Sequence, residues 1–186
     1  GLVRYFDERP FLVPCGFRVE PIELSHDGGP TFGFRIEGRG RRGGRPAAVG
    51  YAADTGIWTD AMADGLSEVD VLGIEYNHDV EMQKRSGRSP YTIARNLGRY
   101  GHLSNEQAAE LTIEVVRRSG SKAPRHLVLL HISHECNLAS LAHHVARTAV
   151  RETGRRVAVH AADQDNPSPI LPVQAPRLAR GTRSAS

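Results

Sequence analysis

The sequence has few of the features that mark secreted, membrane-spanning or zinc-finger proteins. Only two cysteines occur in 186 residues, and Cys15 and Cys136 match no C-x-x-C or zinc-finger spacing. The sequence also lacks an apolar run of about 18 residues and a charged-then-apolar leader. These absences argue against a disulfide framework and a membrane-spanning helix. We therefore expect a soluble protein of a reducing compartment, the cytoplasm.

Composition favours one globular domain, since 39% of the residues are hydrophobic and 24% are charged. The net charge of +3 and the pI near 9.1 favour an acidic partner only weakly. Much of the excess charge lies in two Arg-rich segments, GRGRRGGRP at 38–46 and the C-terminal residues. We assign residues 1–162 to the domain and expect 163–186, which lack periodicity, to be a flexible tail. Because the sequence starts with Gly1, almost directly in a strand, we expect a partial chain.

Hydrophobic periodicity changes along the chain, from β-type in the first half to alternating strand and helix in the second. The predicted strands are 11–13, 17–24, 32–36, 47–52, 69–75, 126–131 and 156–161. The predicted helices start at Thr59, Ser89-Pro90, Ser104 and Asn137 and end near Leu66, Leu97, Arg118 and Glu152. Ser104 with Gln107 three residues later is a capping box, and Ser89 before Pro90 is a second helix-start signal.

Polar residues follow four of the predicted strands, where side chains can converge at one edge of a sheet. They are His26 and Asp27 after PIEL, Asp54 after VGYAA, Asn77, His78 and Asp79 after VLGIEY, and His131 and Ser133 in HLVLLHIS. A carboxylate can bridge two divalent cations, while each imidazole nitrogen completes one coordination shell. His26, Asp54 and His131 are therefore candidate metal ligands.

Five short motifs in this order resemble the later motifs of the metallo-β-lactamase fold. They are LSHDGG (24–29), YAADTG (51–56), EYNHDVEM (75–82), GHLSNEQAA (101–109) and LLHISHECN (129–137). The resemblance spans about residues 17–162. It is strongest to the branch that contains ribonuclease Z, the phosphodiesterase of phosphonate breakdown and a bacterial 5′ to 3′ double-strand DNA exonuclease, and the NHD..M and GHLSN signatures favour that exonuclease.

The resemblance implies an α/β fold, the C-terminal portion of an αββα sandwich, and two divalent cations, zinc or manganese. His26 would bind one cation, Asp54 would bridge both, and His131 would bind the other. His102, just before a capped helix, would be a general acid in phosphodiester hydrolysis. Asn77, His78 and Asp79, with Ser104, Ser133 and Asn137 of the same motifs, would orient ligands or contact a DNA or RNA substrate.

The family's H-x-H-x-D-H signature occurs nowhere in this sequence. We expect a C-terminal fragment, inactive alone, whose missing N-terminal portion or a second copy would complete it. A degenerate, non-catalytic binding or assembly chain is the alternative. Within the enzymes, hydrolysis of a small phosphodiester or another ester is the alternative to nuclease activity.

Each candidate also has a structural interpretation. A strand-end histidine such as His26 or His131 is often a satisfied or surface residue, Asp54 before Thr-Gly could be a turn residue, and His102 could only contact Ser104. The basic loop of Arg39, Arg41, Arg42 and Arg45 could contact nucleic acid, but a solvated hairpin is the commoner case. We interpret the remaining histidines as structural or surface residues: His126, His134, His143, His144 and His160.

Overall fold

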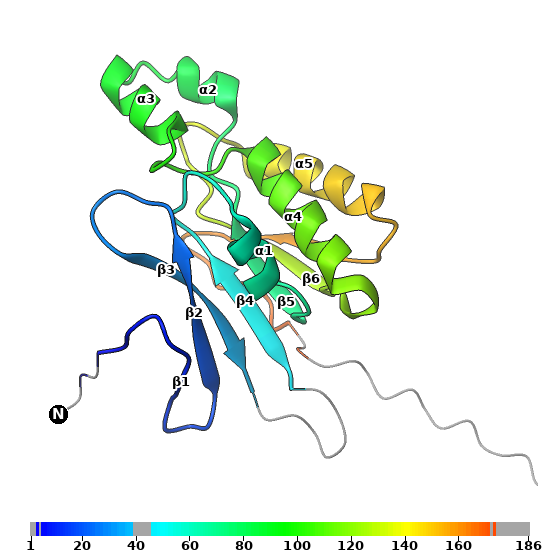
Figure 1. The fold of residues 1–186 in the computed structure, drawn as a ribbon. Coiled ribbons are helices and arrows are strands. Elements are labelled where there is room, and N and C mark those ends of the chain that lie inside the picture. Colours follow the sequence, from blue (N-terminus) through cyan, green and yellow to red (C-terminus); the bar gives the residue numbers. More distant parts are fainter. Residues whose placement is uncertain (1–2, 4, 39–45, 172, 174–186) are drawn as a thin grey trace, which may run out of the picture.

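One mixed sheet of seven strands organises the chain in a computed structural model, which describes residues 3, 5–38, 46–171 and 173. The strands lie side by side in chain order (Figure 1). Their bounds are β1 Phe11–Leu12, β2 Arg18–Leu24, β3 Thr31–Glu37, β4 Ala48–Ala52, β5 Val71–Glu75, β6 His126–Leu130 and β7 Ala158–Ala161. The sheet is the frame on which the polar residues of the five motifs are placed.

Strand direction brings four strand ends to one edge of the sheet. Strands β1 to β4 pair antiparallel through short connections, whereas β4 to β7 pair parallel through helical crossovers. Two antiparallel pairings in succession leave β2 pointing in the same direction as β4, and hence as β5 and β6. The segments that follow these four strands therefore meet at the carboxyl edge, as the sequence predicts.

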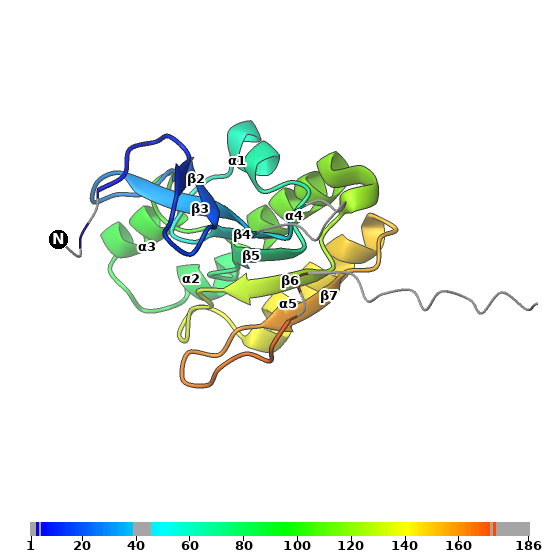
Figure 2. The same cartoon turned by 90° about the horizontal axis from the view of Figure 1, so that it is seen from below.

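Three helices cover one face of the sheet, and two others lie beyond its carboxyl edge (Figures 1 and 2). The helices are α1 Asp60–Gly65, α2 Val80–Lys84, α3 Pro90–Leu97, α4 Asn105–Ser119 and α5 Ala139–Glu152, with a 3-10 turn at Gly120–Lys122. Helices α1, α4 and α5 bury their apolar sides on the sheet, and α4 also packs along α5. No helix in the described part of the chain is long and apolar enough to cross a membrane.

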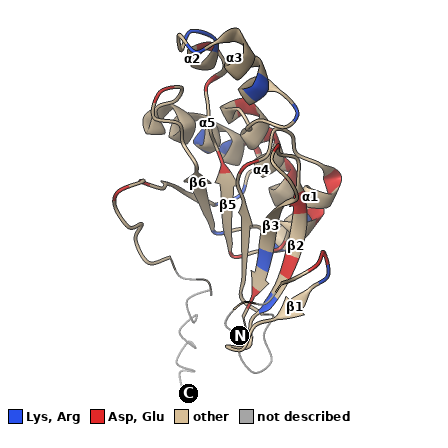
Figure 3. Ribbon diagram, turned by 90° about the vertical axis from the view of Figure 1, so that its left-hand side faces the viewer, with Lys and Arg blue, Asp and Glu red and all other residues tan. Residues whose placement is uncertain are grey.

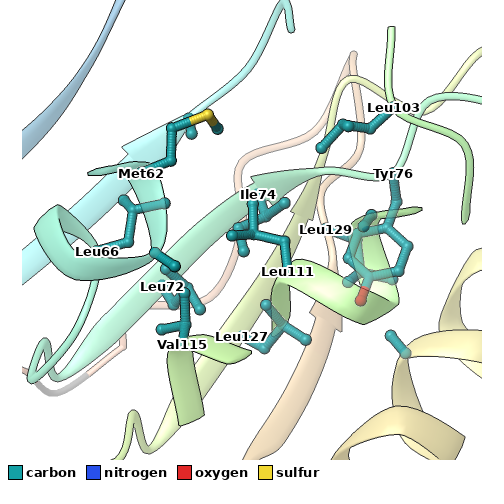
Figure 4. Packing of buried hydrophobic residues seen from close by; sticks show 14 of the residues in the cluster. Met62, Leu66, Leu72, Ile74, Tyr76, Leu103, Leu111, Val115, Leu127 and Leu129 are labelled. Carbon is teal, nitrogen blue, oxygen red and sulfur yellow. The ribbon is translucent and has the colours of Figure 1, made fainter. Parts of the chain in front are cut away.

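The core lies between the sheet and these three helices (Figure 4). Leu72 and Ile74 alternate along β5 and face the helices, as a period of two requires. Fully buried partners come from α1, α4 and β6: Met62, Leu66, Leu111, Val115, Leu127 and Leu129. Each such side chain contributes roughly 1.5–3 kcal/mol by leaving water. This packing holds the strand ends in register with the helices.

The opposite face of the sheet carries an aromatic cluster near the N-terminus. Phe6 contacts the rings of Phe11, Phe32 and Phe34 at centroid distances of 5.3, 5.5 and 5.8 Å. Arg35, the residue after Phe34, points to the other face of the sheet, where it donates to the carbonyl of Ser67. The described residues thus form one sheet with helices on one face, which agrees with the predicted α/β portion of a sandwich.

Most predicted elements are present within two residues of their predicted ends. Thr59 caps α1, Ser89 caps α3, and Ser104 forms the predicted capping box with Gln107. Helix α2 was not predicted, and α5 begins at Ala139 rather than at Asn137. The basic loop of Arg39, Arg41, Arg42 and Arg45 lies outside the described residues. The predicted flexibility of 163–186 remains a prediction.

Asn137 joins three elements at the carboxyl edge. Its buried amide group donates to the carbonyls of Tyr76 and Asn77 at 2.9 and 3.1 Å. It also exchanges hydrogen bonds with the Asn105 side chain at 2.9 and 3.0 Å and accepts from the Leu138 N–H at 2.9 Å. One side chain therefore links the end of β5, the start of α4 and the approach to α5.

We predict that Asn137→Ala lowers the free energy of unfolding by about 3 kcal/mol or more, because several buried polar groups lose a partner at once. Chemical denaturation followed by circular dichroism measures the change. Asn166→Ala is the matched control, since that exposed amide bonds only to Asp163, and it should change stability by less than about 0.5 kcal/mol. Equal stabilities of the two variants would contradict the structural role of Asn137.

Candidate metal centre

Four ligand-type side chains converge at the carboxyl edge of the sheet. Asp54 follows β4, Glu75 ends β5, His131 follows β6, and His102 precedes α4. One potential ligand atom from each lies within 4.8 Å of the others. The structure thus brings together three of the residues singled out from the sequence, Asp54, His102 and His131, and adds Glu75.

Glu75 lies at the centre of the group and is fully buried. Its carboxylate accepts hydrogen bonds from Nδ1 of His102 at 2.7 Å, Nδ1 of His131 at 3.1 Å and the Thr55 N–H at 3.0 Å. Burial, the largest single cause, raises the pKa of this carboxyl, but the hydrogen bonds from His102, His131 and Thr55 and the charge of His102 together lower it below its ordinary value. Glu75 is therefore a carboxylate that holds two imidazoles.

His131 is held from two sides. The hydrogen bond to Glu75 raises the pKa of the imidazole, burial opposes the rise, and the charges of Glu75 and Asp54 add to it. Asn77 donates from Nδ2 to the His131 carbonyl at 2.9 Å and so fixes the backbone beneath the ring. With Nδ1 donating to Glu75, Nε2 is unprotonated in the neutral ring, which is the form that binds a metal.

Asp54 and His131 both have left-handed backbone conformations, with φ of 65° and 51°. Non-glycine residues avoid this region, and each instance costs on the order of 1–3 kcal/mol. Among the other described non-glycine residues, only Glu68 has a positive φ, 56°, in the turn before β5. Two of three strained positions therefore carry the acidic and imidazole groups of one cluster, as functional sites often do.

Close backbone packing places His102. A side chain at Gly101 would put its Cβ 2.3 Å from the carbonyl oxygens of Arg95 and Asn96, so only glycine fits there. The peptide after this glycine lies against the end of α3, and the His102 N–H donates to the Asn96 carbonyl at 3.0 Å. Ser104 then caps α4. The glycine, histidine and serine of GHLSN thus have distinct local roles.

His26 lies beside the group but outside it. Its ring centroid is 5.1 Å from that of His102, which is 5.1 Å from that of His131, so the three imidazoles form a row. Nδ1 of His26 donates to the Gly101 carbonyl at 3.0 Å, which leaves Nε2 free in the neutral ring. The adjacent Asp27 carboxylate is held by Arg95 at 2.5 Å. The role of His26 as a ligand remains a prediction.

The other predicted site residues make local structural contacts. Asp79 caps α2 by accepting from the Met82 N–H at 2.8 Å, and the Ser133 hydroxyl accepts from the Cys136 N–H at 3.2 Å. His78 is 1% exposed, its burial lowers its pKa, and its Nδ1 has no hydrogen-bond partner in the described residues. With Asn137, these residues shape the loops that carry the cluster. Of the predicted orienting residues, only Asn77 is hydrogen-bonded to His131 within the described part of the chain, through the His131 carbonyl.

A hollow of about 760 Å³ opens beside the cluster, between α3 and the start of α5. His102 and His131 line it together with Asn77, Asn96 and Arg88, and Arg88 pairs with Glu135 at 2.6 Å. Asp163 and Gln164, at the start of the predicted flexible tail, also line the hollow. The space is large enough for a small substrate or the end of a polymer.

Sequence reasoning missed Glu75, although it stands inside the motif EYNHDVEM. The sequence predicts it as the last residue of a strand, whereas the candidate residues come from segments that follow strands. The available signal was a carboxylate in the run VLGIE, because a buried acid in an apolar strand needs partners. Its position at the end of a central strand explains why it meets residues from both neighbouring loops.

Comparison with known proteins gives one family and several relatives. A sequence profile described as the beta-lactamase superfamily domain matches residues 5–132. The chain is 29% identical over 157 residues to exodeoxyribonuclease YycJ of Bacillus anthracis, which covers 82% of this chain and 55% of that protein. It is 41% identical over 91 residues to exodeoxyribonuclease WalJ of Streptococcus pneumoniae, covering 48% and 32%. The chain thus spans about half or less of the length of these relatives.

A similar solved structure is Zn(2+)-bound PqqB from Methylobacterium extorquens. The TM-score is 0.50 at 17% sequence identity, and the match covers 83% of this chain and 51% of that one. A likeness at this identity concerns the fold. It agrees with the fold expected from the five motifs.

We predict that Glu75→Gln lowers the pKa of His131 toward its ordinary value of 6.5, because the negative charge of Glu75, which favours the imidazolium form, is removed. In the wild type the raised pKa means that this interaction stabilises the fold below pH 6.5 and is lost as pH rises through the folded-state pKa. An NMR titration of metal-free protein measures the shift. Glu81→Gln, at an exposed carboxylate on α2, is the control. An unchanged His131 pKa in Glu75→Gln would refute the pairing.

Proposed function

The chain belongs to the β-lactamase superfamily, and from this premise we propose that it carries part of the active site of a metal-dependent phosphodiester hydrolase, a DNA exonuclease. The observation that carries the proposal is the cluster of Asp54, Glu75, His102 and His131 at the carboxyl edge of the sheet. The names of the exodeoxyribonucleases to which it is similar support DNA as the substrate.

The donor set fits divalent cations. Asp54 offers two carboxylate oxygens, His131 has Nε2 free, and its Nδ1–H is held by a buried carboxylate, as in many metal-binding histidines. Imidazole and carboxylate together suit zinc or manganese. We propose that Asp54 and His131, with His26 beside them, hold two ions. Catalytic zinc sites usually have three protein ligands per ion, so we also propose that further ligands come from outside this chain.

The bound cations would supply a hydroxide nucleophile at neutral pH and neutralise charge on the phosphate. Among the chain's own residues, Glu75 fixes the rings of His102 and His131 through their Nδ1 atoms. We propose that His102, which lines the hollow, holds a proton at Nε2 and gives it to the leaving oxygen. Glu75 acts through these rings and is a positioning residue.

Two other functions would use the same residues differently. A small-molecule phosphodiesterase would need only the hollow of about 760 Å³ beside the cluster. A non-catalytic chain would keep the fold without binding metal. Parallel assays on duplex DNA, single-stranded DNA, RNA and bis(p-nitrophenyl) phosphate separate nuclease from small-molecule activity, and metal content separates enzyme from binding chain.

We predict that the full-length protein containing this chain binds divalent cations and cleaves DNA, and that Asp54→Ala and His131→Ala each reduce both properties by at least about a hundredfold. Metal content is measured by mass spectrometry after dialysis, and cleavage with added manganese or zinc. His144→Ala, an exposed histidine on α5, is the matched control. A wild-type protein that binds no metal would favour the non-catalytic alternative.

We predict a different result for His102→Ala. Metal content should stay at the wild-type level, while kcat falls by about 10²–10⁴-fold, because a proton donor and not a ligand has been removed. A substrate with a better leaving group should recover much of the rate. Loss of metal in His102→Ala would assign this histidine to the coordination shell instead.

A further inference from the structure

Four arginines on one side of the molecule lack an acidic partner. Arg147 and Arg151 lie on α5, and Arg155 and Arg156 precede β7; all four are exposed. None forms an ion pair within the described part of the chain, and the residues outside that part include no Asp or Glu. By contrast, ion pairs hold other basic side chains such as Arg9, Arg95, Arg117 and Arg118.

The local charge is high for this chain. Residues 143–159 contain four Arg and one Glu, a net charge of +3 (4 − 1), and the whole chain also carries +3 (24 − 21). The acid is the exposed Glu152, which does not line the hollow described next. Figure 3 shows basic segments on α5. Unpaired charge of one sign on a surface is an electrostatic footprint for an anionic partner.

These arginines surround a second hollow, of about 520 Å³, at the end of the sheet opposite to the cluster. Val150, Val157 and Val159 contribute to its apolar part. Its basic part comes from these four arginines together with Arg125. Guanidinium groups bind phosphate through two parallel N–H donors, and their flat faces tolerate apolar surroundings. The positive charge of the hollow and the paired N–H donors of its guanidinium groups therefore suit the phosphates of a sugar-phosphate backbone.

One face of α5 connects the two hollows. Ala139 lines the hollow beside the cluster, whereas His143, Arg147 and Arg151 line the arginine hollow. These positions are spaced by four residues and so share one face of the helix. The rise of 1.5 Å per residue separates Ala139 from Arg151 by about 18 Å, the length of about five base pairs at 3.4 Å each.

We propose that the arginine hollow, defined by Arg147, Arg151, Arg155 and Arg156, binds the backbone of a DNA substrate whose end occupies the cluster at the carboxyl edge. This inference rests on the proposed nuclease function. The arginine hollow would contribute affinity for DNA from a surface outside the active site. The first few base pairs from the DNA end would then lie along α5. The contacts are to phosphates and carry no sequence preference.

The test compares Arg147→Ala/Arg151→Ala with wild type in the full-length protein. Binding of a fluorescein-labelled DNA duplex is measured by anisotropy in EDTA, over a series of salt concentrations. The variant should bind about tenfold more weakly, and its dependence of log K on log salt should be shallower by about two, one for each lost phosphate contact. Turnover of bis(p-nitrophenyl) phosphate with added metal should match wild type, because that substrate is too small to reach the hollow.

Arg9→Ala/Arg117→Ala is the matched control, since it removes the same charge from two ion-paired arginines outside the hollow. Wild-type affinity and salt dependence in Arg147→Ala/Arg151→Ala would overturn the inference even if the protein proves to be a nuclease. Equal losses in both double variants would also overturn it, since net charge alone would then explain binding. If the protein binds DNA through these arginines but does not cleave it, the surface stands and the nuclease function fails.

Discussion

The cluster depends on the hydrogen bonds that surround the buried carboxylate of Glu75. A charge removed from water is costly unless hydrogen-bonded groups surround it, and Glu75 meets this condition through His102, His131 and the Thr55 N–H. Its partners come from three segments far apart in sequence, after β4, before α4 and after β6. Removing any one of them would leave a buried charge with fewer donors. The need to satisfy Glu75 thus keeps these loops at one place.

Much of the fold followed from local patterns, because its elements are strongly periodic and well capped. The alternation in β5 and the capping box at Ser104 each specify an element without tertiary information. Helix α2 was missed since five residues are too few to show a helical period, and its cap, Asp79, was taken for a site residue. The start of α5 was placed two residues early because Asn137 resembles a cap but instead joins three elements.

The sequence predicts where the candidate site lies but does not predict all the residues that form it. Motif order and strand ends identified Asp54, His102 and His131, since parallel strands bring their carboxyl ends together. They could not identify Glu75, whose role depends on which side chains face it across neighbouring strands. The same motifs contain residues such as Asp79 and Ser104 that cap helices. A motif therefore contains both residues of the candidate site and residues that stabilise loops and helix ends. Only the contacts in the structure distinguish the two kinds.

The distance between the cluster and the arginine hollow has a physical consequence. About 18 Å along α5 exceeds the Debye length of about 8 Å at physiological ionic strength. Charge at Arg151 therefore hardly alters the protonation of His131 or the cation affinity proposed for Asp54. The phosphate binding proposed at one end of the helix and the metal binding proposed at the other would then change independently. A rigid helix, packed on the sheet and on α4, fixes the spacing between them.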